Sequence, residues 1–116
     1  MITLIVTTYN RPEYLSRCLD SVKKLSPMPD SILLMDDAST DIRTQILIDE
    51  FQAPCAVGKY RLGKNGGIKT SLRLGCDMAF AAGADLVINL DADALVKPEL
   101  IEELAFYHKF GKGEFI

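Results

Sequence analysis

Cysteine is scarce in this sequence, a long apolar stretch is missing, and positive charge is not in excess. The three cysteines, Cys18, Cys55 and Cys76, form no CxxC pair, which argues against a disulfide or zinc scaffold and indicates a reducing compartment. With 13 basic and 16 acidic residues the net charge is −3, so we expect no nucleic-acid partner, because such a partner requires a basic surface. No apolar run approaches the roughly 20 residues of a membrane span, and the first residues lack the basic segment of a signal peptide. We therefore expect a cytoplasmic protein with no membrane span.

Apolar segments of strand length alternate with segments of helical spacing along the 116 residues. This pattern predicts strands at residues 2–7, 31–35, 59–62 and 85–90, and helices at residues 12–25, 42–51, 68–82 and 98–110. We expect Ser39 or Thr40 to cap the second helix. The alternating order predicts an α/β fold: a doubly wound, mostly parallel sheet with helices on both faces. Residues 113–116 look like the start of another strand, which predicts a single domain that spans 1–116 and is truncated at its C-terminal end.

Polar residues follow three of the predicted strands, at the edge of the sheet where open α/β folds bind their ligands. They are Thr7-Thr8-Tyr9-Asn10, Asp36-Asp37 and Asp91-Ala92-Asp93. Two carboxylates spaced as Asp91 and Asp93 can approach one hard cation, and Mg²⁺ keeps water and substrate phosphates in its remaining positions. In the alternative interpretation, one of the two caps the following turn and the other is solvated.

The other two polar clusters are also open to two interpretations. The Asp36-Asp37 pair can accept hydrogen bonds from a base or a ribose, or it can cap the next helix. Residues 7–10 can offer a hydroxyl, an aromatic face and an amide to a nucleobase. Alternatively, they form an ordinary turn in which Asn10 caps the helix that begins at Pro12.

Taken together, four strings of the sequence resemble the nucleotide-sugar-binding half of family 2 glycosyltransferases, which have the GT-A fold. The strings are VTTYNR (6–11), MDDASTD (35–41), KNGG (64–67) and LDAD (90–93), and the resemblance runs from Ile2 to about Phe110. It implies a Rossmann-like nucleotide-binding half. It also implies an inverting, metal-dependent enzyme of the hexosyltransferase type that takes its sugar from a nucleotide-diphosphate sugar, with a UDP-sugar favoured. The acceptor, whether sugar, lipid or protein, is unknown.

The resemblance also implies roles for individual residues. Asp37 corresponds to the acid that bonds the base. Asp91 and Asp93 look like the DxD motif, in which the last acid ligates Mn²⁺ or Mg²⁺ and the first reaches the ribose or the metal shell. Such a cation stabilises the charge that develops on the diphosphate leaving group. The positions that correspond to the family's nucleotide-binding residues are Thr7, Tyr9, Asp36, Asp37, Asn65, Gly67 and Asp91.

Two features depart from the family. Where the family often has Arg-Asn, one further residue and Gly in its third helix, this chain has Leu72-Arg73-Leu74-Gly75. The family's fold is also roughly twice as long, and the half that this chain lacks carries the acceptor site and the catalytic base. We therefore expect the fragment to be inactive by itself, and we expect His108 to lie at the surface.

Three other interpretations use the same residues. A response-regulator receiver, which is a phosphoacceptor domain, has an acidic pair like Asp36-Asp37, but that pair ends its first strand. Its lysine also lies farther beyond the acceptor than Lys97 lies beyond Asp91. A P-loop fits residues 63–70 except that Ile68 replaces a required glycine. A non-catalytic interaction module is the third alternative, because an exposed sheet edge can bind a partner or a second copy of the chain.

Overall fold

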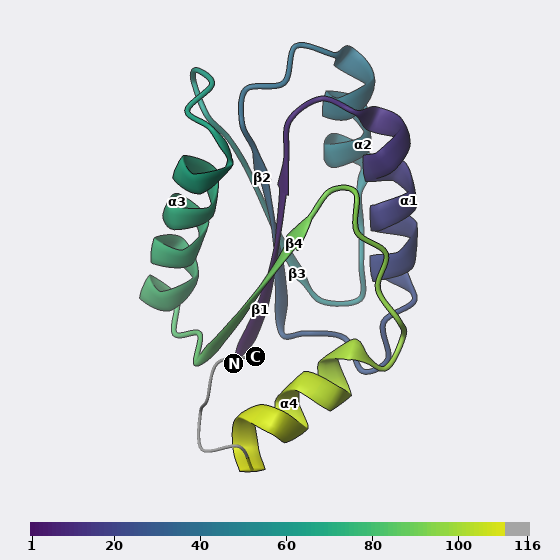
Figure 1. The fold of residues 1–116 in the computed structure, drawn as a ribbon, viewed down its shortest axis with the longest axis vertical. Helices are drawn as coiled ribbons and strands as arrows, with labels where there is room; N and C mark the ends of the chain where they lie inside the picture. The colour runs from purple at the N-terminus through teal and green to yellow at the C-terminus, as the bar shows by residue number, and fades with distance from the viewer. Residues whose placement is uncertain (111–116) are drawn as a thin grey trace.

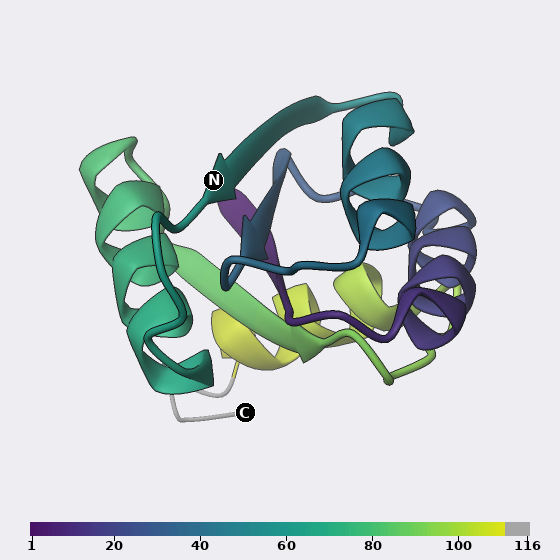
Figure 2. The ribbon, with the colours of Figure 1, turned by 90° about the horizontal axis from the view of Figure 1, so that it is seen from above.

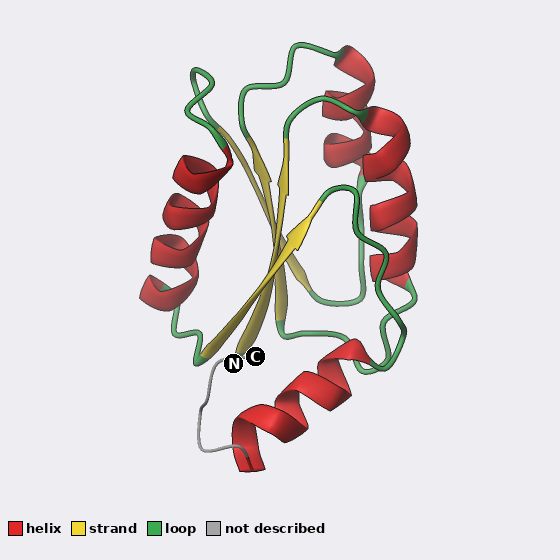
Figure 3. Cartoon of the chain, in the orientation of Figure 1, coloured by secondary structure: helices red, strands yellow, loops and turns green. Residues whose placement is uncertain are grey.

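The strands form one parallel sheet with helices on both of its faces (Figure 1, Figure 3). The computed structural model describes residues 1–110, and side chains as far as residue 106. The elements are β1 (Ile2–Thr8), α1 (Pro12–Lys23), β2 (Ser31–Asp36), α2 (Ile42–Glu50), β3 (Ala56–Arg61), α3 (Ile68–Ala81), β4 (Leu86–Asp91) and α4 (Leu100–Phe110). The predicted α/β fold with a doubly wound parallel sheet is confirmed. The strand expected at residues 113–116 and the side chain of His108 lie outside the described residues.

β1 lies inside the sheet, whose strand order is β3-β2-β1-β4. Every residue of β1 after Ile2 is buried, because helices cover both faces. Leu4 and Val6 join the core beneath α1 and α2, whereas Ile5 joins the core beneath α3. A strand buried on both faces has a continuous apolar sequence rather than an alternating one, which explains why its sequence predicted it so directly.

The helices divide between the two faces of the sheet as a doubly wound fold requires. Figure 2 shows α3 on one side and α1 with α2 on the other. The first turn of α4 adds Ile101, which is 3% exposed, to the core beneath α1 and α2. None of the helices within residues 1–110 is long and apolar enough to cross a membrane.

Two elements begin more than one residue away from their predicted starts. β3 begins at Ala56, three residues before the predicted start at residue 59. It is an edge strand whose side chains are mostly exposed, so its first half carries no apolar run that a sequence pattern can detect. α4 begins at Leu100 rather than at Pro98, because Pro98 and Glu99 form a turn before the helix.

The helix caps also differ from the prediction. Asp41 caps α2, and its Oδ1 accepts a hydrogen bond from the Arg43 backbone N–H at 2.9 Å, so the expectation of Ser39 or Thr40 was wrong. α1 has Arg11 at its N-cap position with no side-chain hydrogen bond. The alternative interpretation, in which Asn10 caps α1, is therefore also wrong, and Asn10 serves a different helix.

α3 approaches the sheet closely at Gly75. A Cβ atom built at this glycine would lie 3.1 Å from Met35 Cγ and 3.3 Å from Ile5 Cδ1. Both of these side chains are fully buried, so they have little room to move. Gly75, which matches the glycine of the family pattern, thus has a packing explanation, whereas the departure from that pattern lies at Leu72 and Arg73.

We predict that Gly75→Val lowers the free energy of unfolding by about 1–3 kcal/mol, because the added methyl groups overpack the contact between α3 and the sheet. The matched control is Gly63→Val, since a Cβ at Gly63 meets no atom within 4 Å. Urea unfolding of both variants measures the difference. Equal stability of the two variants would show that the close approach at Gly75 is absent in solution.

Candidate functional site

The register of the sheet brings polar strand ends together at one edge. Thr7 of β1 pairs with Asp91 of β4, and Thr8 pairs with Asp36 of β2. Thr7 Oγ1 also donates a hydrogen bond to Asp91 Oδ1 at 3.4 Å. The strands β1 to β4 are parallel and all run upward in Figure 1. Their carboxyl ends, and the polar residues there, therefore lie along the same edge of the sheet.

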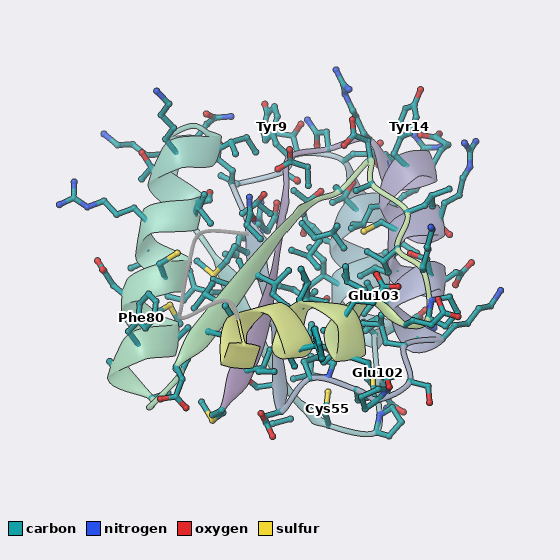
Figure 4. All side chains as sticks on the ribbon, turned by 60° about the horizontal axis from the view of Figure 1, so that its bottom comes forward. Tyr9, Tyr14, Cys55, Phe80, Glu102 and Glu103 are labelled. Atoms are coloured by element: carbon teal, nitrogen blue, oxygen red, sulfur yellow. The ribbon has the colours of Figure 1, made fainter. Side chains whose placement is uncertain are left out.

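A cavity of about 300 Å³ opens at the ends of β1 and β4, at the lower limit of the usual size of small-molecule sites. Tyr9 and Tyr14, both almost half exposed, lie at its mouth and share the upper edge of the molecule in Figure 4. The cavity is lined by Thr7, Thr8, Tyr9, Asn10, Arg11, Tyr14, Ile68, Asp91, Ala92 and Asp93. Among these residues, the sequence patterns had singled out residues 7–10 together with Asp91 and Asp93. They assigned no role in a binding site to Arg11, Tyr14 or Ile68.

Asp91 and Asp93 give one wall of the cavity a negative charge. Both are exposed, and both line the cavity. These charges act electrostatically on Cys18. Cys18 is a buried residue of α1, and its Sγ lies 3.8 Å from the Asp91 carbonyl oxygen. Burial, together with the charges of Asp93 and Asp91, raises the pKa of Cys18 to about 11. The thiol therefore stays neutral at physiological pH and adds no further negative charge to this wall.

The oxygen donors of this wall suit a hard cation of the Mg²⁺ or Mn²⁺ type. Within the described residues, no group of three or more His, Cys, Asp or Glu side chains could enclose a metal ion. An ion held by Asp91 and Asp93 would therefore take its remaining ligands from water or from a bound anion. Such an incomplete protein site is usual where Mg²⁺ also binds phosphate.

Asp37 lies beside the cavity, and its own chain satisfies its carboxylate. The side chain is 1% exposed, and its two oxygens accept hydrogen bonds from the Gly66 and Gly67 N–H groups at 2.8 and 2.9 Å. Asn65 Oδ1 also accepts from the Gly67 N–H, at 3.2 Å. In a P-loop, N–H groups of this loop would bind phosphate, whereas here a carboxylate already occupies two of them. Asp37, Asn65 and Gly67 thus fix the turn that precedes Ile68, which does line the cavity.

Asp36 is buried on a different side of the strand ends. Its Oδ1 accepts hydrogen bonds from the Ser39 N–H at 3.1 Å and from the Ser39 hydroxyl at 2.5 Å, and Asp36 Oδ2 lies 3.8 Å from Arg61 Nε. Asp36 lines a second cavity, of about 220 Å³, together with Lys59 and Arg61. The structure thus does not bring Asp36 into the cavity at β1 and β4, and its role in nucleotide binding stays a prediction.

Comparison with known proteins shows which family the chain matches. Residues 3–113 match the family model for Glycosyl transferase family 2. Glycosyltransferase GlyG of Streptococcus pneumoniae serotype 4 is 27% identical over 104 residues, which cover 90% of this chain and 34% of GlyG. A Nostoc sp. protein named "Uncharacterized glycosyltransferase alr2836" is 31% identical over 107 residues, which cover 89% of this chain and 31% of that protein.

The fold is also similar to a solved structure. Residues 1–349 of TarS from S. aureus match 93% of this chain with a TM-score of 0.78 and 24% identity. The match covers 32% of that structure, and the chain spans about a third of the length of the two glycosyltransferases. The family match at residues 3–113 includes the strand ends that form the cavity and covers nearly all of the described residues. The chain therefore belongs to glycosyl transferase family 2.

Proposed function

We propose that this chain forms the donor-binding part of a glycosyltransferase that uses a nucleotide-diphosphate sugar, with a UDP-sugar as first choice. The observation that carries the proposal is the cavity in which Thr7, Tyr9, Asp91 and Asp93 meet. Membership of the family supports it. So does TarS, a protein of the same fold that has been crystallised with UDP-GlcNAc and with UDP.

The charge of the cavity wall supports a role for a divalent cation. A diphosphate beside Asp91 and Asp93 meets like charges, and two unit charges 4 Å apart repel by about 4 kcal/mol at an effective dielectric constant near 20. We therefore assign Mn²⁺ or Mg²⁺ to this wall, held by Asp93, with Asp91 in its shell or on the ribose. When bound, the cation stabilises the negative charge of the departing diphosphate.

The nucleoside is proposed to bind at the β1 side of the cavity. Tyr9 offers an accessible ring to the base, and the Thr7 hydroxyl, whose partner is Asp91, adds a polar group. Asp37 holds the Gly66-Gly67 turn with both oxygens, and each oxygen has a further lone pair for a base N–H. We also propose that Asp36, Asn65 and Gly67, which lie outside the lining of the cavity, contribute to nucleotide binding through the turns that they fix beside it.

An inverting glycosyltransferase also needs a general base and an acceptor site, and we assign neither of them to the cavity. An inverting transfer requires a general base that deprotonates the acceptor hydroxyl as it attacks the anomeric carbon. The cavity's only carboxylates, among the described residues, are Asp91 and Asp93, and both are given to the cation and ribose. We propose that the base and the acceptor site are contributed by parts of the enzyme outside residues 1–110, and that the enzyme acts in the cytoplasm.

We predict that Asp93→Asn weakens UDP binding in the presence of Mn²⁺ by at least about tenfold, because it removes a metal-binding charge and keeps the shape of the side chain. Calorimetric titration with and without Mn²⁺ measures this. The control is Asp20→Asn, which removes the same charge from an exposed position outside the cavity. If Asp93→Asn binds UDP as the unaltered chain does, the metal assignment is wrong.

For Asp37→Ala we predict a loss of about 1–3 kcal/mol in the free energy of unfolding, since the variant removes the acceptor of the Gly66 N–H and one of the two acceptors of the Gly67 N–H beside a buried position. Asn65→Ala is the matched control, because Asn65 accepts from the same Gly67 N–H at an exposed position, where water replaces the lost bond. Urea unfolding compares the two. A loss in Asn65→Ala as large as in Asp37→Ala would contradict the structural role of Asp37.

A further inference from the structure

Three non-glycine residues with left-handed backbone conformation gather at the two turns beside the cavity. Asn10 and Arg11, which follow β1, have φ angles of 53° and 54°, and Ala38, which follows β2, has a φ of 60°. Residues other than glycine rarely adopt this conformation, and it persists where surrounding contacts hold it. Asn10 and Arg11 line the cavity directly, as does the adjacent Tyr9, so whatever holds this turn also shapes the cavity.

Asn10 connects the two turns through both its backbone and its side chain. Its N–H donates a hydrogen bond to Ser39 Oγ at 2.7 Å. Its Oδ1 accepts hydrogen bonds from the Thr40 and Asp41 N–H groups, each at 3.0 Å. Asp41 is the N-cap residue of α2 and Thr40 precedes it, so Asn10 from the β1–α1 turn binds the backbone just before another helix. The two turns run side by side in Figure 1 and Figure 2.

The opposite end of this connection is itself fixed. Ser39 is fully buried, and both its N–H and its hydroxyl donate to Asp36 Oδ1. The Ser39 carbonyl oxygen accepts a hydrogen bond from Arg61 Nη2 at 2.8 Å. The contacts therefore run without interruption from the cavity wall at Asn10 to the ends of β2 and β3, which are parts of the rigid sheet.

We infer that Asn10 is a positioning residue: by fastening residues 9–11 to residues 39–41, it holds Tyr9 and Arg11 in place at the cavity wall. Asparagine suits this task because its short amide tolerates the left-handed conformation and bonds to nearby backbone groups. The consequence for ligand affinity rests on the proposed nucleotide binding, whereas the fastening of the two turns does not. Asp36, which does not line the cavity, acts in the same way through Ser39.

The test separates backbone conformation from hydrogen bonding at position 10. Asn10→Gly keeps the left-handed conformation without strain but loses the acceptor, whereas Asn10→Asp retains an acceptor oxygen for Thr40 and Asp41. We expect roughly tenfold weaker UDP binding with Mn²⁺ in Asn10→Gly, because two hydrogen bonds that hold the turn are lost. Asn10→Asp is expected to bind within about threefold of the unaltered chain.

The control is Asp41→Ala, which removes the capping acceptor of the same helix and leaves Asn10 with its partners. It is expected to lower the unfolding temperature and to leave UDP affinity unchanged. Amide resonances of Tyr9 and Arg11, recorded without nucleotide, give a second readout: they shift in Asn10→Gly and keep their positions in Asp41→Ala.

The outcomes distinguish this inference from the proposed function. Unchanged resonances of Tyr9 and Arg11 in Asn10→Gly would overturn the inference, and so would a loss of affinity in Asp41→Ala as large as in Asn10→Gly. If the unaltered chain binds no UDP while the resonances shift as expected, the fastening by Asn10 stands and the proposed nucleotide binding fails.

Discussion

The register of β1 between β2 and β4 is the constraint on which the rest of the structure depends. Because β1 is buried on both faces, a shift of one residue would exchange its two sets of apolar side chains between the two cores. The same register sets Thr7 beside Asp91 and Thr8 beside Asp36. Core packing and the composition of the cavity wall are thus fixed by one set of backbone hydrogen bonds.

The acidic residues at this edge divide into two groups by how their charges are accommodated. Asp36 and Asp37 are buried, and N–H and O–H donors of their own chain satisfy them, so they hold turns in place. Asp91 and Asp93 are exposed on the cavity wall, where the Thr7 hydroxyl reaches only Asp91. Unlike the buried pair, they present their oxygens at an exposed surface, and this is why we assign a cation to them. The sequence shows four similar carboxylates; only burial separates structural anchors from candidate ligands.

The sequence predicted those features that depend on local patterns. The apolar runs of β1, β2 and β4 located the interior of the sheet, and the parallel order then predicted a common edge for Thr7, Tyr9, Asp91 and Asp93. What it missed depends on contacts between distant segments. Arg11 and Tyr14 reach the cavity because of how α1 begins. Asn10 bonds to Thr40 and Asp41, which lie 30 and 31 positions farther along the chain. β3 was placed too late because an exposed edge strand has little apolar pattern.

The most direct test of this account is the amide spectrum of the ¹⁵N-labelled chain during titration with UDP and Mg²⁺. The account predicts that the shifted resonances cluster at residues 7–11, at Tyr14, at Ile68 and at residues 91–93, which line one cavity, and at residues 66–67, which form the turn before Ile68. Shifts confined to the opposite edge of the sheet would contradict it. An unchanged spectrum at saturating UDP would also contradict it, since the cavity would then not be a nucleotide site in this chain.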